Sequence, residues 1–238
     1  MDRGIWVSWY DLPEDGRDAY LAWVREVYMP RLLKQPRYLW AAHYAAVDKG
    51  DIRVHTDDPS VPAGTRYFLL VGAEDADAFG NPVPSALHAS LPPESRKMLA
   101  MRIGERTNIL AEAGRVEGPA AKDYQGAAGP GPCIQLGSYN CPWQHEEEML
   151  AWYAQARMPA MATTPGGGIR IRKLASVAGW AKHAVLYEFA SVAARNHYFT
   201  AHKDRPDMKP WLDWVARWLT HAPGSSSLGH RIWPAVSS

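Results

Sequence analysis

The sequence predicts an α+β protein in which two tandem ferredoxin-like units, each of β-α-β-β-α-β order, pack into one pseudo-symmetric α+β barrel. Three observations lead to this fold class. A segment near the start of the chain is repeated after its middle, the expected elements run in the same order behind each copy, and a stretch rich in Gly, Ala and Pro separates the copies. We expect the first unit at residues 1–118, a linker at 119–130 and the second unit at 131–238.

The repeat is ungapped and covers the first helix of each unit. Tyr10–Pro36 aligns with Tyr139–Pro165 at a constant spacing of 129 residues, and eight of the 27 positions are identical. The identities include tryptophan, methionine and several prolines, so chance is a poor explanation. The identical pairs are Tyr10/Tyr139, Pro13/Pro142, Leu21/Leu150, Ala22/Ala151, Trp23/Trp152, Met29/Met158, Pro30/Pro159 and Pro36/Pro165.

The first copy starts with a strand, a proline turn and an acidic helix start. Glu14 and Asp15 lie where negative side chains suit the positive end of a helix dipole, and the helix ends near Met29-Pro30. The Asp, Pro and Gly content of Lys49–Pro62 predicts a surface-loop insertion. The expected elements are strands at Ile5–Tyr10, Tyr38–Ala45, Tyr67–Gly72 and Thr107–Val116, with helical segments in Pro84–Ile103.

The second copy repeats this order. Glu146–Glu148 supplies the acidic helix start, and the helix again ends near a Met-Pro step. Trp211, Trp214 and Trp218 recur at the spacing of a core-facing helical stripe. The expected elements are strands at Ile134–Tyr139, Ile169–Val177, Ala184–Phe189 and Gly229–Trp233, with helices from Ala193 onward and at Pro210–Thr220.

The composition excludes several classes of function. Hydrophobic residues make up 47% and charged residues 21%, the balance of a globular protein with a sizeable core. A net charge of +1 without a basic stripe excludes a nucleic-acid partner. We expect a cytoplasmic protein without a membrane partner, because no apolar run approaches 18 residues and no signal-peptide pattern is present. Cys133 and Cys141 are expected as free thiols, and no metal-ligand spacing accompanies them.

The segment Trp23–Pro36, a helix that runs through a Met-Pro step toward a strand, resembles the first helix of EthD-like proteins, members of the dimeric α+β barrel superfamily. Members of this superfamily usually carry one ferredoxin-like unit and pair two chains into a barrel, so a chain with both units resembles a fused dimer. The family tends to place a His two positions before a Pro in this helix, where this sequence has Tyr28 and Arg157. A role of that His therefore does not carry over.

Alternation along the strands assigns each side chain to a face. Apolar and polar residues alternate in Ile169–Arg172 and again in Ile134–Gly137. We expect the apolar set to face the helices and the polar set to face the barrel. Carried through the spacing of 129, this places four residues of the first unit on the barrel face, with Tyr139 opposite Tyr10: Trp6, Ser8, Tyr10 and His43.

The expected catalytic residues are His43, Tyr10, Tyr139 and Arg172. An imidazole in mid-strand suits a general base, with a buried, hydrogen-bonded His as the alternative. The tyrosines would donate hydrogen bonds to a substrate oxygen, or would be structural.

Trp6, Arg170 and Glu188 are expected to bind substrate. The arginines would bind a carboxylate or enolate if the face assignment holds. Glu188 in an apolar strand needs a partner, and an ion pair with Arg170 or Arg172 is the structural alternative. His88, flanked by prolines, borders a pocket mouth or is exposed.

The resemblance implies a cofactor-independent enzyme that transfers protons on a small aromatic or polyketide-like carbonyl compound, as a lyase, isomerase or cyclase. One alternative is a haem protein similar to the chlorite dismutase group, with His183 or His197 as axial ligand. The other is a non-catalytic module that binds a small ligand. A homodimer through outer surfaces stays open.

Overall fold

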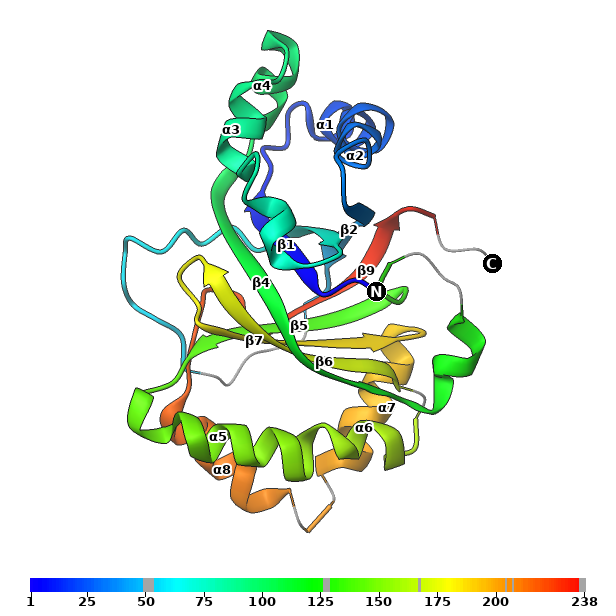
Figure 1. The fold of residues 1–238 in the computed structure, drawn as a ribbon, viewed down its shortest axis with the longest axis vertical. Helices are drawn as coiled ribbons and strands as arrows, with labels where there is room; N and C mark the ends of the chain where they lie inside the picture. The colour runs from blue at the N-terminus through cyan, green and yellow to red at the C-terminus, as the bar shows by residue number, and fades with distance from the viewer. Residues whose placement is uncertain (49–53, 126–128, 167, 204, 207, 236–238) are drawn as a thin grey trace.

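Two groups of helices lie on opposite sides of one barrel of strands in the computed structural model (Figure 1). The structure describes residues 1–48, 54–125, 129–166, 168–203, 205–206 and 208–235. Residues 49–53 of the expected insertion and 126–128 of the expected linker lie outside the described residues.

The first half has the strand order of a ferredoxin-like unit. Its strands are β1 (Gly4–Asp11), β2 (Tyr38–Ala46), β3 (Tyr67–Ala73) and β4 (Ile103–Glu117), and they pair in the order β4-β1-β3-β2. All of these pairs are antiparallel. The helices are α1 (Arg17–Trp23), α2 (Met29–Leu32), α3 (Pro84–Ala89) and α4 (Pro93–Leu99).

The second half repeats this order. Its strands are β5 (Cys133–Asn140), β6 (Gly168–Ala178), β7 (His183–Phe189) and β9 (Ser227–Trp233), paired as β9-β5-β7-β6, with the short β8 (Thr220–His221) beside β5. The helices are α5 (Glu146–Trp152), α6 (Pro159–Thr163), α7 (Val192–Lys203) and α8 (Lys209–Trp218). The matching strand orders confirm the duplication.

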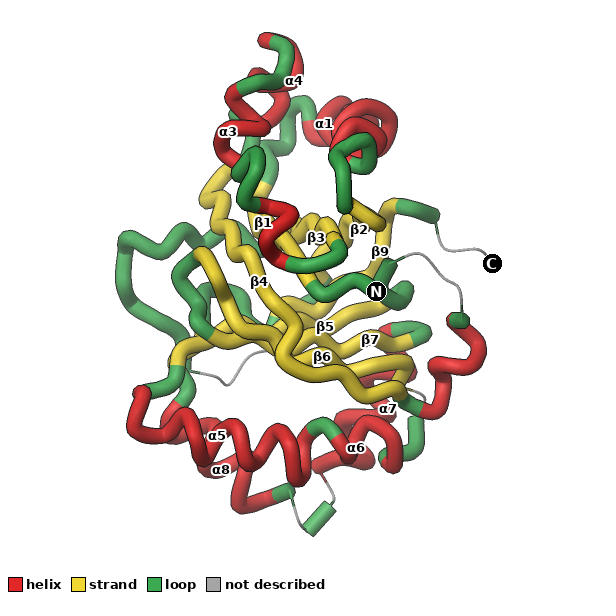
Figure 2. The backbone as a smooth tube through the Cα atoms, in the orientation of Figure 1, coloured by secondary structure: helices red, strands yellow, loops and turns green. Residues whose placement is uncertain are grey.

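The barrel closes within the chain. β2 pairs with β9 and β4 pairs with β6, so each half contributes one strand to each of the two joints (Figure 2). With β7 paired to β5, the described residues form a closed ring of eight antiparallel strands. This is the pseudo-symmetric α+β barrel that the sequence predicts.

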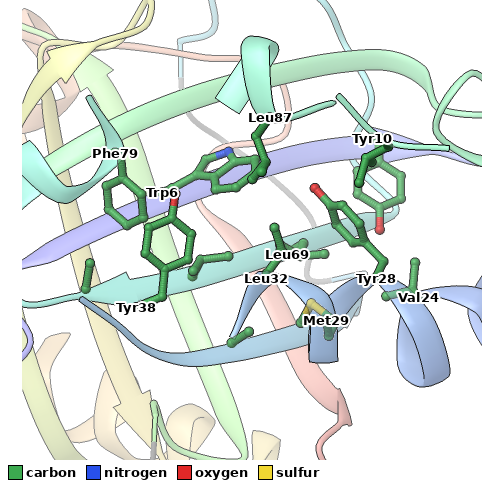
Figure 3. Packing of buried hydrophobic residues seen from close by; sticks show 14 of the residues in the cluster. Trp6, Tyr10, Val24, Tyr28, Met29, Leu32, Tyr38, Leu69, Phe79 and Leu87 are labelled. Carbon is green, nitrogen blue, oxygen red and sulfur yellow. The ribbon is translucent and has the colours of Figure 1, made fainter. Parts of the chain in front are cut away.

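Three apolar cores follow from this arrangement. One lies inside the barrel and contains residues of both halves, among them Val7, Phe68 and Leu136. The other two lie between a sheet and the helices of the same half. Figure 3 shows the first of these, where Trp6, Tyr10 and other apolar residues pack together between strands and helices.

Each first helix changes to π-helical geometry at the same place in the repeat. The π-helical turns are Val24–Tyr28 and Tyr153–Arg157, and Trp23 and Trp152 immediately precede them. Such turns widen a helix by one residue per turn and often occur at functional sites. Both tryptophans pack against the helix–sheet core of their half, as expected for equivalent residues.

Several element boundaries differ from expectation. The helical segment Pro84–Ile103 is split into α3 and α4, because Pro92-Pro93 removes backbone donors and starts a new helix. Part of the expected linker forms a 3₁₀ helix at Pro119–Tyr124. Thr220, expected at the end of a helix, belongs to β8.

The expected face of β1 and β5 is wrong. Ile5, Val7 and Trp9 line the barrel, together with Ile134 and Leu136 of β5. Trp6, Tyr10 and Tyr139 instead pack in the helix–sheet cores. The physical reason is that the barrel interior also holds a packed apolar core, so strand parity alone does not tell which apolar face meets the helices.

His43 also faces the helices and not the barrel. It lies opposite Leu69, which belongs to the first helix–sheet core. In the second half Lys173 lies opposite Val185, which belongs to the second helix–sheet core. Lys173, and not Arg172, is therefore the equivalent of His43: one extra residue between the first and second strands of the second half shifts the spacing from 129 to 130.

Candidate functional site

The structure distributes the residues expected at one site over three places. Tyr10, His43 and Trp6 lie in the helix–sheet layer of the first half, and Tyr139 lies in that of the second half. The three remaining residues lie at one end of the barrel: Arg170, Arg172 and Glu188.

Tyr10 and His43 form the first of two tyrosine–histidine pairs in the first half. The Tyr10 hydroxyl and Nε2 of His43 share a hydrogen bond of 2.8 Å between β1 and β2. Both side chains are buried; the Tyr10 ring stacks on that of Tyr67, and the His43 ring lies tilted against it. The two residues meet because their strands flank β3 on either side.

Tyr28 and His88 form the second pair. The Tyr28 hydroxyl lies 2.6 Å from Nε2 of His88, which is only partly buried. Tyr28 ends the π-helical turn, and His88 lies in α3. Trp6 closes one side of this pair, with its ring 5.5 Å from that of His88.

Arg102, in the turn between α4 and β4, lies between the two pairs. Its guanidinium carbon is 4.5 Å from the Tyr10 ring centre and 5.3 Å from that of Tyr28. Nε donates to the Tyr20 hydroxyl at 2.6 Å, and Nη1 forms an ion pair with Glu105 at 2.6 Å. Nη2 is buried and makes no hydrogen bond of ordinary geometry among the described residues. The Nη2 amino group of Arg102 is therefore left for a further acceptor. We call Tyr10, Tyr20, Tyr28, His43, His88, Arg102 and Glu105 the Arg102 cluster.

Burial keeps both histidines neutral and both tyrosines protonated. Desolvation and the positive charge of Arg102 lower the pKa of His43 to about 3 and that of His88 to about 4. Desolvation raises the pKa of Tyr10 and of Tyr28 well above the ordinary value. At neutral pH the two pairs thus offer two phenol donors and two neutral imidazoles beside the guanidinium of Arg102.

Sequence reasoning missed most of this cluster. Arg102, Tyr20 and Tyr28 have no motif, because they lie on three segments that meet only in the fold. Tyr10 and His43 were expected at the site, and the proline-flanked His88 was expected either at the border of a pocket or exposed. A second usable signal is the repeat position that holds Tyr28 in one half and Arg157 in the other. The resemblance to EthD-like proteins predicts a His at that position.

The second half carries a different cluster at the equivalent place. The hydroxyls of Tyr139 and Tyr153 share a short hydrogen bond, and Nε of Arg157 donates a short one to the Tyr187 hydroxyl. The ammonium of Lys173, the equivalent of His43, lies 5.5 Å from the Tyr153 ring centre. The Tyr139 ring also stacks on that of His183, whose Nε2 lies 2.9 Å from Glu146, so the polar partners differ from those in the first half.

Arg172 belongs to an ion network that closes one end of the barrel. It pairs with Asp2 at 2.9 Å and with Glu112 at 2.5 Å, and Arg115 contacts the same two carboxylates. Arg170 similarly lies between Glu117 and Glu188. The pair of Arg170 with Glu188 is the ion-pair alternative that the sequence left open, and the charge of Arg172 is paired as well.

The two histidines named for the haem alternative lie on different elements, His183 in β7 and His197 in α7. Nε2 of His183 lies 2.9 Å from Glu146, and His197 is exposed on α7. Between α7 and β7, the rings of Phe189, Tyr198 and Phe199 lie in mutual contact. In the described part of the chain, no three His, Cys, Asp or Glu side chains converge as metal ligands, and no helix has the length and apolar character to cross a bilayer.

Comparisons with known proteins show the fold. No model of a protein family matches the sequence, and no curated protein matches it. An anthrone oxidase-like structure is 11% identical, with 98% of this chain and 92% of the other covered and a TM-score of 0.61. A monooxygenase-like protein of Fusobacterium nucleatum is 8% identical over 98% and 93%, with a TM-score of 0.59.

A mutant chlorite dismutase of Candidatus Nitrospira defluvii is 11% identical over 96% of this chain and 90% of that one, with a TM-score of 0.51. At these identities the likeness extends to the architecture alone. The chain shares the α+β barrel fold of these structures and carries both ferredoxin-like units in one polypeptide.

Proposed function

We propose that the Arg102 cluster binds a small aromatic or polyketide-like carbonyl compound and transfers a proton on it without a cofactor. The observation that carries the proposal is the buried Arg102, with Nη2 uncommitted, between two tyrosine–histidine pairs. A guanidinium held in a dry site stabilises an oxygen that becomes negatively charged, such as an enolate oxygen.

The side chains divide the work in this proposal. Arg102 and the Tyr28 hydroxyl hold the carbonyl oxygen, and neutral His88 accepts the proton from the neighbouring carbon. The electron pair of the C–H bond stays on the substrate as the enolate. A protonated His88, with its pKa lowered to about 4, returns the proton readily to the product. His43, fully buried behind Tyr10, positions the Tyr10 ring beneath the guanidinium.

The resemblance to EthD-like proteins agrees with this class of substrate. The anthrone oxidase-like and monooxygenase-like neighbours favour a second candidate, in which molecular oxygen oxidises the enolate. For anthrone the balance is one ketone and one O₂ giving anthraquinone and water. Both candidates share the deprotonation step, so one substrate tests them in sequence.

The test uses anthrone under nitrogen in D₂O, with exchange of its methylene protons followed by NMR. We expect the protein to accelerate exchange, Arg102→Met to lower the rate about 10²- to 10³-fold, and His88→Gln to lower it about 10²- to 10⁴-fold. Arg157→Met, which removes a buried arginine of the second half, is the matched control and should retain the rate.

The same samples under air distinguish the candidates, because anthraquinone formation with oxygen uptake supports the oxygenase. Binding of anthrone without exchange would favour a non-catalytic module. A loss of exchange in Arg157→Met with none in Arg102→Met would move the site to the second half.

A further inference from the structure

A second buried arginine, Arg106, lies inside the barrel at the end opposite to the Arg172 network. It is 4% exposed and lies across from Trp9 in the pairing of β4 with β1. Because Trp9 lines the barrel core, Arg106 points into the barrel as well. Its guanidinium carbon lies 4.2 Å from the Trp9 ring centre.

No carboxylate of the described residues pairs with Arg106. Nη1 donates to the Ser138 hydroxyl at 3.2 Å, Nη2 makes a long bond to the Pro223 carbonyl at 3.3 Å, and buried Nε makes none. The contrast with Arg172 is direct, because that equally buried arginine contacts two carboxylates. A buried charge without a counter-charge costs far more free energy than one that is paired.

The surroundings of Arg106 supply hydroxyl groups. The Ser138 hydroxyl accepts from Arg106, which leaves its own proton to donate. Ser225 lies beside it, since the Ser138 backbone donates to the Ser225 hydroxyl at 2.8 Å. His221 Nδ1 lies 3.2 Å from that hydroxyl. A cation with two neighbouring hydroxyls and no acid matches a negatively charged guest.

We propose that this end of the barrel binds a small oxyanion, a carboxylate or a sulfate-like ion, held by Arg106 with the hydroxyls of Ser138 and Ser225. The anion neutralises the guanidinium and accepts from its uncommitted Nε. Burial lowers the pKa of Arg106 to about 10, which still leaves it charged at neutral pH. The proposal does not depend on the Arg102 cluster, which lies on the other face of the sheet.

The experiment titrates the whole chain with sodium sulfate, phosphate, acetate or benzoate against sodium chloride of equal ionic strength, by calorimetry at 25 °C and by thermal unfolding. We expect saturable binding of at least one anion, with Tm raised by about 3 to 6 °C at ten times the dissociation constant. The sulfate and phosphate arms against the acetate and benzoate arms identify the class of anion.

Arg106→Met should abolish the saturable signal, and Arg106→Lys should weaken binding at least severalfold, because a lysine lacks the planar donor fork. The lysine variant keeps the comparison valid if the methionine variant does not fold. Sulfate also stabilises proteins by exclusion from their surface, so an equal, unsaturated rise in all variants would overturn the proposal. Absence of saturable heat with all four anions in the wild-type protein would overturn it as well.

Discussion

His43 shows how burial changes the chemistry of one side chain. An exposed histidine has a pKa near neutrality, whereas desolvation in the helix–sheet layer and the charge of Arg102 lower that of His43 to about 3. The folded state therefore holds His43 neutral at pH values where the unfolded chain protonates it. In the folded chain, Nε2 of His43 is hydrogen-bonded to the Tyr10 hydroxyl.

This difference predicts how stability depends on pH. Below the unfolded pKa of about 6.5 the unfolded state binds the proton and the native state does not, so His43 lowers the free energy of unfolding as pH falls toward 3. Between pH 6.5 and 5 this amounts to about 2 kcal/mol. Urea unfolding of the wild-type protein and His43→Gln at both pH values should give a smaller pH dependence for the variant. Equal dependences would show that His43 does not have the lowered pKa.

Between β2 and β3, the Trp40 ring packs against the backbone at a position that only a glycine can occupy without a clash. Gly72 and Trp40 lie opposite each other, and a Cβ at Gly72 would come within 2.0 Å of the Trp40 ring. The ring fills the barrel core and its indole nitrogen donates to Asp2 at 2.9 Å. Because Gly72 has no side chain, the Trp40 ring can pack in the apolar core while its indole nitrogen donates to Asp2 of the ion network.

Gly72→Ala should therefore destabilise the protein by about 1 to 3 kcal/mol or more, because the Trp40 ring must move within a packed core. Gly114→Ala on β4 is the matched control, since its Cβ would meet only the flexible end of Met158 at 3.3 Å. Urea unfolding of both variants tests this. A loss of stability no larger for Gly72→Ala than for Gly114→Ala would contradict the account.

At the scale of the whole molecule, the duplication converts a dimer interface into an interior. The barrel core draws on strands of both halves, and the two joints β2–β9 and β4–β6 each cross between them. Neither half can bury that face alone. Because the ring of strands closes within one chain, a second chain is not needed to complete the barrel. A homodimer through the outer surfaces stays a prediction.

Residues 1–118 expressed alone should expose the barrel side of their sheet, including Trp9, Tyr44 and Phe68. Large exposed apolar patches drive association in water. We expect this fragment to aggregate or to elute at twice its mass or more in size-exclusion chromatography with light scattering, and residues 131–238 to reduce that association. A folded, monomeric fragment would show that the shared core is dispensable.

The sequence by itself determined the repeat, the element order and the fold class. The Tyr, Trp, Met and Pro identities at one spacing indicate the same first helix in both halves. Alternating apolar runs indicate the strands locally. Only the tertiary structure decided which face of each strand met the helices, because both faces are apolar. In β2, the change in spacing from 129 to 130 residues also reversed the face assigned to His43.

The candidate site was likewise decided by tertiary structure. Tyr10 and His43 were predicted together and do lie together, but Arg102 and Tyr28 come from segments that carry no shared pattern. The same holds for the two barrel ends, where Arg172 pairs with carboxylates and Arg106 has no carboxylate partner among the described residues. Whether a buried charge is paired depends on distances across the fold, and a one-dimensional pattern does not contain them.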